Sequence, residues 1–301
     1  MASKIIRPSP QLSYSIEIVG ARRPGFTDLY HWLMRIPWPA LIGLIGGVYV
    51  AVSMVFAVLY MLVGGIANAD PHNFLDHFFF SVQTVGTMGS AAMYPTSRAA
   101  NAVVTLQSLF GLFMTALSTG LVFIRFSLVK ARIVFGQKAT IGPMDGIPTL
   151  MIRLGNDRSN QIHDAQMRVT LMTAGITKEG SKWYRSLDLE LVRDRASALA
   201  RSWTILHQVT ERSPLHGMTP DTLKAREAEL YVTVSGTDDT SMQTVHARHV
   251  YEHFSIVFGA KLADVLSDLS DGNLRLDLTR FHEVIPTEPL PAFPYPAAGK
   301  S

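Results

Sequence analysis

The stretch Phe78–Ala91, which reads FFFSVQTVGTMGSA, decides the fold of this chain of 301 residues. Two long runs without charged residues, Pro37–Ala69 and Ala99–Ile124, lie before and after it. Each run holds roughly 25 residues or more, and at about 1.5 Å per residue each can cross the roughly 30 Å apolar core of a bilayer as a tilted helix. The stretch between them is too short to cross, and its glycine-bearing end would leave backbone groups unpaired in lipid. The chain therefore reads as a span, a re-entrant loop and a second span.

The composition indicates a membrane protein that also carries a large water-exposed part. The apolar content of 48% and the mean hydropathy of +0.18 are high, yet Arg, Asp, Glu and His gather in the second half. The roughly 170 residues after Arg132 are enough for one domain with its own core. The chain has no cysteine, which excludes disulfides and thiolate metal sites, and its net charge of +3 gives no ground for nucleic-acid binding.

Basic residues near the two runs predict the membrane topology. Only Arg98 lies between the runs, whereas seven others flank them: Arg22, Arg23, Arg35, Arg125, Lys130, Arg132 and Lys138. By the positive-inside rule, both termini are expected in the cytoplasm and the loop is expected outside. The segment before the first run is too long and too charged for a secretory signal.

The region before the first span divides into two parts. Residues 1–25 hold three prolines and scattered charges, so we expect an extended or poorly ordered cytoplasmic segment. Phe26–Ile36 then places aromatic and apolar side chains at helical spacing beside charged ones. This pattern favours a short helix in the membrane interface that ends at Pro37, and the alternative is a continuation of the first span.

One face of the second run carries small and polar side chains at helical spacing, namely Ser108, Gly111, Thr115, Ser118, Thr119 and Val122. In a membrane helix such residues face other helices or water, so the face indicates either close helix packing or a water-filled vestibule. The neighbouring loop also needs a cavity, which favours the vestibule. Phe123, at the cytoplasmic end of this face, is predicted to close it as a hydrophobic constriction.

Beyond Arg132 the sequence changes to short β-rich stretches separated by turn signals. Five stretches are predicted as strands: Thr149–Leu154, Gln166–Met172, Trp203–Leu206, Glu229–Val234 and Arg275–Leu278. Such strands without long amphipathic helices argue for a β-sandwich, which we place at residues 133–285. Residues 286–301 hold five prolines and are expected to form a disordered tail.

Several short motifs in both halves of the chain follow one another in the same order as in a known protein family. Asp28-Leu-Tyr-His-Trp is typical of a slide helix, Phe78–Thr84 of a pore helix and Leu121–Phe126 of the end of an inner helix. The second half adds Pro148–Met151, Ser202-Trp203, Ser213–Leu215, His246–His249 and Arg280-Phe281. In these motifs, which extend over roughly residues 26–284, the chain resembles the bacterial inward rectifier potassium channels of the KirBac group.

The resemblance implies a homotetramer in the bacterial inner membrane, with four two-span pore domains of residues 26–132 around one axis. A cytoplasmic immunoglobulin-like β-sandwich would extend the conduction path. The resemblance also implies roles for residues of this chain: Ser108, Thr115 and Thr119 would line the cavity, Gly111 and Gly120 would be hinges, and Phe123 would be the gate. Thr115 stands where strongly rectifying relatives carry an acidic residue, so weak block by intracellular polyamines or Mg²⁺ is expected. No enzyme activity, metal or other cofactor is expected.

The basic cluster of Arg22, Arg23, Arg125, Lys130 and Arg132 has two interpretations. It is either ordinary positive-inside topology or, as the resemblance implies, a site for anionic phospholipids. Leu128-Val129 stands where the family usually has Arg-Pro, which weakens the second interpretation.

The ion-selecting loop is where the chain departs from the family. Potassium channels use TVGYG-type loops whose carbonyl oxygens replace the hydration shell of the ion. The equivalent residues here are Thr87, Met88, Gly89, Ser90 and Ala91, without the Tyr and the second Gly. A second register, starting at Thr84-Val85-Gly86, shortens the pore helix by three residues and displaces everything after it.

This departure predicts a loss of potassium selectivity. A left-handed Ala91 would cost about 1–2 kcal/mol per subunit, hence about 4–8 kcal/mol for four, and Ser90 lacks the ring that packs against the pore helices in the family. Thr87 and Gly89 remain, so a pathway for potassium and also for sodium is expected.

Other motifs have plainer interpretations. His246, His249 and His253 are spaced like metal ligands but fall in strand-like sequence, where residues three apart point to opposite faces. Gly299-Lys300-Ser301 resembles the end of a phosphate loop by chance. Two other functions stay open: a non-conducting or regulatory channel subunit, and a membrane-anchored β-domain that acts as a receptor or scaffold.

Overall fold

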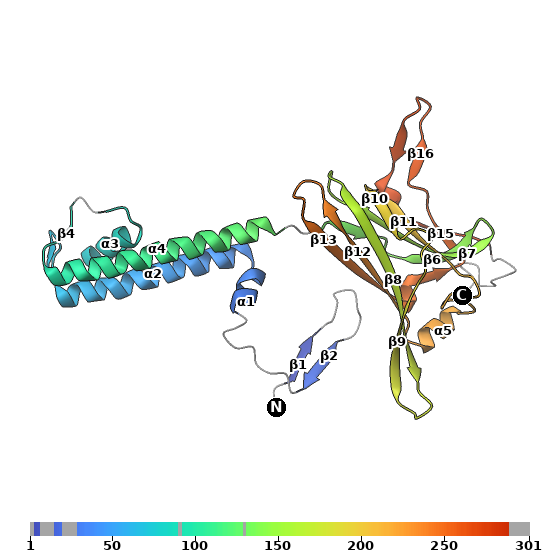
Figure 1. Ribbon diagram of the computed structural model, residues 1–301, viewed down its shortest axis with the longest axis horizontal. Helices are drawn as coiled ribbons and strands as arrows, with labels where there is room; N and C mark the ends of the chain where they lie inside the picture. The colour runs from blue at the N-terminus through green and yellow to red at the C-terminus, as the bar shows by residue number, and fades with distance from the viewer. Residues whose placement is uncertain (1–2, 7–14, 20–28, 90–91, 129–130, 289–301) are drawn as a thin grey trace. The chain divides into compact units, whose positions relative to one another are not determined.

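The computed structural model describes residues 3–6, 15–19, 29–89, 92–128 and 131–288. Figure 1 traces the chain. It divides into two compact units, one of residues 22–128 and the other of residues 1–21 and 129–301.

The unit of residues 22–128 is helical. Its helices are α1 (Leu29–Arg35), α2 (Trp38–Val63), α3 (Phe74–Val85) and α4 (Arg98–Ser127), and the strands β3 (Ile66–Ala67) and β4 (Tyr94–Pro95) pair antiparallel. The 26 residues of α2 and the 30 of α4 confirm the two predicted spans, at lengths of about 39 and 45 Å. Pro37, at the N-terminal cap of α2, separates α1 from α2.

The surfaces of α2 and α4 are apolar, as a lipid environment requires. Leu62 is 77% exposed, Leu112 62% and Leu117 68% in the single chain. A small apolar cluster, centred on Phe56, Tyr60 and Phe80, is buried among the three longer helices. The Tyr60 and Phe80 rings meet edge to face with centroids 5.0 Å apart, which joins α2 to α3.

The second unit is a two-sheet β-sandwich. One sheet has the order β10 (Arg195–Leu199), β8 (Ile162–Ile176), β12 (Glu229–Asp238) and β13 (Thr244–Glu252), and β9 (Lys182–Asp188) pairs with the far end of β8. The other has the order β11 (Trp203–Gln208), β7 (Ile147–Asn156), β6 (Ala139–Met144) and β14 (Ile256–Phe258), and β5 (Ile133–Phe135) pairs with β7. Neighbouring strands are antiparallel except β14 and β6. Buried and partly exposed residues alternate along β12, and the apolar core lies between the two sheets.

Smaller elements complete this unit. They are the helix α5 (Pro220–Ala225), the hairpin of β16 (Leu266–Asp268) and β17 (Leu274–Leu276), the pair β15 (Ala260–Leu262) and β18 (Val284–Pro286), and the pair β1 (Ser3–Ile6) and β2 (Ile16–Val19). The β16–β17 hairpin projects from the sandwich (Figure 1).

Four of the five predicted strands lie within observed strands, and the fifth needs a correction. Strand β17 ends at Leu276, and residues 278–280 form a 3₁₀ turn instead of continuing the strand to Leu278. The reason is local: the Asp277 carboxylate accepts the Thr279 N–H at 3.0 Å and caps the turn.

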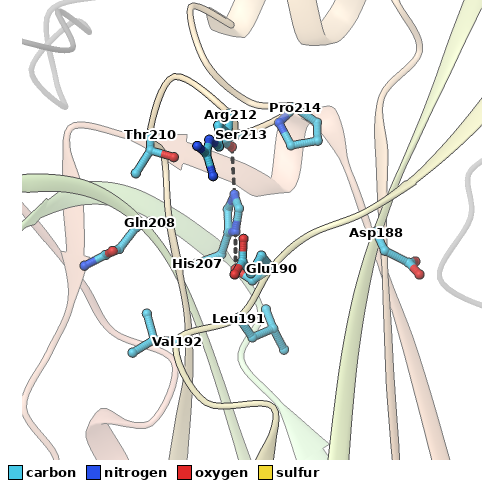
Figure 2. A pocket seen from close by; sticks show the side chains of 10 residues that line it. All are labelled: Asp188, Glu190, Leu191, Val192, His207, Gln208, Thr210, Arg212, Ser213 and Pro214. Atoms are coloured by element: carbon cyan, nitrogen blue, oxygen red, sulfur yellow. Dashed lines mark hydrogen bonds between the residues drawn. The ribbon is translucent and has the colours of Figure 1, made fainter.

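A buried histidine lines a pocket of about 340 Å³ between the β9–β10 loop and the loop after β11 (Figure 2). His207 is 3% exposed, and its Nδ1 lies 2.6 Å from the Glu190 carbonyl oxygen, which can only accept. Nδ1 therefore carries the proton, and Nε2 accepts from the Ser213 hydroxyl at 2.7 Å. The Ser213 oxygen in turn accepts the Leu215 N–H at 3.1 Å. The neutral ring is fully paired, and burial lowers the pKa of His207.

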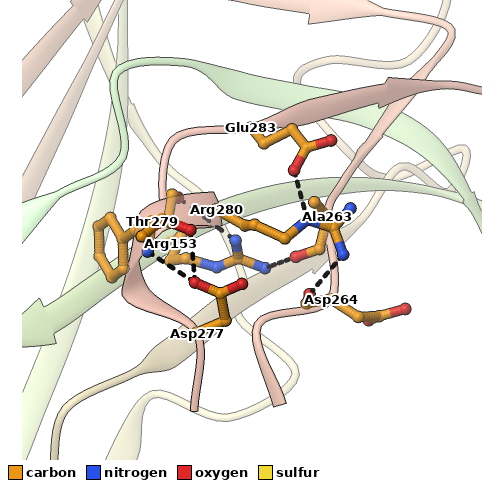
Figure 3. Close-up of polar contacts among 8 residues, drawn as sticks. Arg153, Ala263, Asp264, Asp277, Thr279, Arg280 and Glu283 are labelled. Carbon is orange, nitrogen blue, oxygen red and sulfur yellow. Dashed lines mark hydrogen bonds and ion pairs between the residues drawn. The ribbon is translucent and has the colours of Figure 1, made fainter. Parts of the chain in front are cut away.

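A buried arginine fixes the C-terminal segment to the second sheet (Figure 3). Arg153 on β7 is 4% exposed and donates to the carbonyl oxygens of Ala263 at 2.5 Å and Phe281 at 3.3 Å. Burial lowers the pKa of Arg153, and the nearby Asp264 carboxylate opposes that shift. Close by, Arg280 pairs with Glu283 at 2.5 Å. Arg153 thus holds two separate segments of the chain, at Ala263 and Phe281, against β7.

We expect the β-sandwich to lose stability as the pH falls. Because the folded state lowers the pKa of His207 below its ordinary value of 6.5, unfolded chains bind the extra proton first once the pH drops through that value. The slope is at most about 1.4 kcal/mol per pH unit for one proton. Thermal unfolding of the whole chain in detergent from pH 7.5 to 5.5 measures it. His207→Gln should be less stable at pH 7.5 than the native chain, and its stability should be less sensitive to pH. An unchanged slope in His207→Gln would contradict the expectation.

Candidate pore loop

The short helix α3 is capped at its N-terminus by side chains of the preceding turn. The Asn73 side-chain oxygen accepts the Leu75 N–H at 3.0 Å, and its amide donates to Asp76 at 3.0 Å. The other Asp76 oxygen accepts the Asp70 N–H at 3.0 Å. A capped start with a carboxylate in the first turn stabilises a helix of only 12 residues.

The C-terminus of α3 forms a Schellman motif. The Thr87 N–H donates to the Thr84 carbonyl at 3.1 Å, and the Met88 N–H reaches back to the Gln83 carbonyl at 3.0 Å. This motif requires a left-handed residue, and Thr87 takes that role with φ of +53°. A β-branched residue in this conformation costs about 1–2 kcal/mol, which the two hydrogen bonds offset.

The residues after α3 alternate in backbone hand. Thr87 has a positive φ, Met88 does not, and Gly89 again has a positive φ of +69°. The Met88 side chain is 74% exposed in the single chain, and no atom of the described residues lies within 4 Å of where a Cβ of Gly89 would be. Ser90 and Ala91, the last two residues of the predicted filter, lie outside the described residues.

A buried polar network joins α3 to both long helices. The Gln107 amide on α4 donates to the Ser81 carbonyl at 3.0 Å and to the Ser81 hydroxyl at 2.5 Å, and its oxygen accepts from the Tyr60 hydroxyl at 2.5 Å. All three side chains are fully buried. Figure 1 shows α3 lying against α2 and α4 within this unit. The sequence does not reveal this network, although Gln107 is one of two amide side chains in the second apolar run and so marks a polar position there.

The backbones of α4 and α3 approach each other closely at Gly111. A Cβ at this position would lie 2.5 Å from the Val85 carbonyl oxygen. The small residue at position 111 is therefore explained by helix packing, one of the two interpretations that the sequence left open. Around Gly120, the second predicted hinge, the part of the chain that the structure describes places no atom within 4 Å of where a Cβ would be.

The remaining predicted cavity and gate residues lie along α4. Ser108 is half-buried, whereas Thr115, Thr119 and Phe123 are exposed in the single chain. The last three are spaced four residues apart and so share one face of the helix. Their exposure leaves this face open for water or for another copy of the chain.

Arg125 is held inside the helical unit. Its Nη2 donates to the Ile36 carbonyl, and its guanidinium lies 5.0 Å from the centre of the Trp38 ring. The Trp38 and Phe126 rings are 4.8 Å apart, so the end of α4 packs on the start of α2. Arg132 is exposed, and Arg22, Arg23 and Lys130 lie outside the described residues.

The described part of the chain holds no group of His, Asp and Glu that could bind a metal ion. His249 packs between Phe135 and Tyr251, with ring centroids 5.1 and 4.4 Å away, and burial lowers its pKa. His246 is exposed on the same strand, and His253 begins a 3₁₀ turn. The predicted phosphate-loop resemblance at residues 299–301 lies outside the described residues.

The chain is similar in sequence to known inward rectifier potassium channels. Residues 133–297 match the family model for the inward rectifier potassium channel C-terminal domain. The inward rectifier potassium channel Kirbac3.1 of Paramagnetospirillum magnetotacticum is 38% identical over 90% of this chain and 93% of its own length. G protein-activated inward rectifier potassium channel 1 of Gallus gallus is 30% identical over 73% of this chain, and the match spans 47% of its length. Inward rectifier potassium channel irk-1 of Caenorhabditis elegans is 24% identical over 91% of this chain and 55% of its own.

The chain spans nearly all of the bacterial relative and about half of the animal ones. Its two long apolar helices, the short helix between them and the β-sandwich occur in the order that its motifs predict. The chain belongs to the inward rectifier potassium channel family, a family of membrane channels and not of enzymes.

Proposed function

We propose that this chain assembles as a homotetramer and conducts cations passively through a pore formed by four copies of α3 and the loop after it. Membership of a potassium channel family supports this proposal. The fold supports it too, because α3 is too short to cross a bilayer and ends in backbone that needs a watery cavity at membrane depth. The negative end of the α3 dipole favours cations at that point.

The alternating backbone at Thr87, Met88 and Gly89 is the observation that carries the proposal. A backbone of alternating hand directs successive carbonyl oxygens to one side, which is the arrangement that a carbonyl-lined filter requires. Thr84 and Val85 remain helical, so the filter register that begins at Thr87 is favoured over the one that begins at Thr84.

We infer that selectivity for potassium over sodium is poor. The alternation reaches position 91 next, and the chain has Ala there and not the glycine that accepts a left-handed backbone without cost. Ser90 offers no aromatic ring to pack behind the filter. Fewer well-placed oxygens then surround the ion, and discrimination between potassium and sodium depends on the number and arrangement of those oxygens.

The other proposed roles are supported by the family membership of the chain and by the exposed face of α4. Thr115, Thr119 and Ser108 would line the cavity below the filter, and Phe123 would form the gate at its cytoplasmic end, with Gly120 and Gly111 as hinge positions. The basic flanks favour an inner-membrane protein with both termini in the cytoplasm. Anionic phospholipids would contact the cluster of Arg22, Arg23, Arg125, Lys130 and Arg132.

Assembly is the first test. Native mass spectrometry of the full chain in detergent should give a dominant mass of four copies. The reason is that the exposed face with Thr115, Thr119 and Phe123 needs partners or water. A dominant monomer or dimer would refute the proposed pore.

Ion selectivity is the second test. In liposomes the present chain should show a reversal potential that depends similarly on potassium and sodium gradients. Ser90→Tyr with Ala91→Gly should restore potassium selectivity, and by more than the two single changes together, because both residues act on one structural unit. Strong potassium selectivity of the present chain would sink the filter argument. Flux absent from the present chain and from the double variant would favour the non-conducting subunit.

Block from the cytoplasmic side is the third test. The present chain should be blocked weakly by spermine, and Thr115→Asp should raise the affinity about tenfold or more, since four carboxylates concentrate cations in a cavity of low dielectric constant. Leu117→Asp, on a different face of α4, is the matched control and should not raise it. Equal block in the native chain and Thr115→Asp would show that Thr115 does not line the conduction path.

A further inference from the structure

A tyrosine of α2 contacts the end of α3, just before the residues of the proposed filter. The Tyr49 hydroxyl donates to the Val82 carbonyl oxygen at 2.7 Å. The same oxygen accepts the Gly86 N–H at 3.0 Å, so both of its lone pairs are used. The bond therefore joins α2 to the last turn of α3, immediately before the left-handed Thr87.

Gly86 gives the tyrosine its space. A Cβ at this position would lie 3.1 Å from the Tyr49 hydroxyl oxygen, 3.1 Å from the Met88 Cε and 3.2 Å from the Val82 carbonyl oxygen. The backbone of Gly86 is right-handed, with φ of −72° and ψ of 0°, a conformation open to any residue. The glycine thus leaves room for Tyr49 and Met88, which a Cβ would push away by a few tenths of an ångström, and its conformational freedom is not needed here.

We propose that Tyr49 is a positioning residue for the ion filter, because it fixes the turn that carries Thr87. The inference rests on the proposed function, since it assigns Tyr49 to the same filter. Its physical basis is that hydrogen-bonding alternatives are scarce at membrane depth, so this donor and acceptor stay together. After Gly89 the sequence has no aromatic side chain before Tyr94. Support of the filter by an aromatic side chain is therefore expected at the end next to α3.

A double-mutant cycle between Tyr49 and Gly86 tests the inference in the full chain in detergent. Hydrogen–deuterium exchange is measured at the amides of Gly86, Thr87 and Met88, which are bonded to the last turn of α3. Tyr49→Phe should raise exchange at these amides about threefold to tenfold, the range expected for one intramembrane hydrogen bond. Gly86→Ala should also raise it, because the new Cβ, 3.1 Å from the Tyr49 hydroxyl oxygen, would push that oxygen away by a few tenths of an ångström and weaken its bond to Val82.

The two effects should not add. Once Phe replaces Tyr49, the hydroxyl is gone and the new methyl group at position 86 has more room, so the double variant should match Tyr49→Phe alone. Two matched controls should leave exchange unchanged. They are Tyr30→Phe, at a residue 56% exposed on α1, and Gly46→Ala, where none of the described residues comes within 4 Å of the new Cβ. Native exchange in Tyr49→Phe, or an equal effect of Gly86→Ala in both backgrounds, would overturn the inference.

A second measurement separates positioning from mere stability. The ratio of potassium to sodium permeability in liposomes should change about threefold or more in Tyr49→Phe while the melting temperature of the assembly stays within the range of the controls. An unchanged ratio together with a lowered melting temperature would reduce Tyr49 to a structural role and overturn the inference. Absence of cation flux in the native chain would instead refute the proposed function, and the exchange cycle would still decide whether Tyr49 holds the turn.

Discussion

The helical unit depends on one buried side-chain amide, that of Gln107. Its two N–H groups are taken by Ser81 on α3, and its oxygen is taken by Tyr60 on α2. Three helices are thereby joined at one point where no water is available to replace a lost partner. Leaving such a group unpaired costs about 1–3 kcal/mol, which is large beside the weak van der Waals forces that otherwise hold membrane helices together. The position of α3, and so of any filter that follows it, rests on this amide.

The remaining contacts of α3 fix its two ends. Asn73 and Asp76 cap the start, and the Schellman bonds of Thr87 and Met88 close the end. At the C-terminal end, Gly111 also lets the backbone of α4 approach the Val85 carbonyl more closely than any larger residue would allow. A helix of only 12 residues would be marginal alone, so its order comes from these caps and from tertiary contact.

The sequence predicted the large features because they follow from length and periodicity. Two uncharged runs long enough to cross a bilayer and a shorter helical stretch between them need no tertiary information, and neither does the alternating pattern of Glu229–Val234. The prediction that the last strand continues to Leu278 is wrong, because the Asp277 side chain competes with the sheet for the Thr279 N–H. Partner identities were out of reach: nothing in the sequence says that Gln107 meets Ser81, or that the carbonyls of Ala263 and Phe281 satisfy a buried Arg153.

The left-handed Thr87 shows how a conformation that a residue disfavours becomes stable. Its cost of about 1–2 kcal/mol is met at the end of a helix, where the carbonyls of Gln83 and Thr84 accept hydrogen bonds from Met88 and Thr87. Gly89 needs no such compensation because it lacks a Cβ. Position 91 stands six residues beyond the last residue of α3, so a left-handed alanine there would have no free helix carbonyls within reach to offset its cost. The same strain is therefore tolerable at the first residue of the proposed filter and unfavourable at the last, so we expect any departure from the family's geometry at the outer end of that filter.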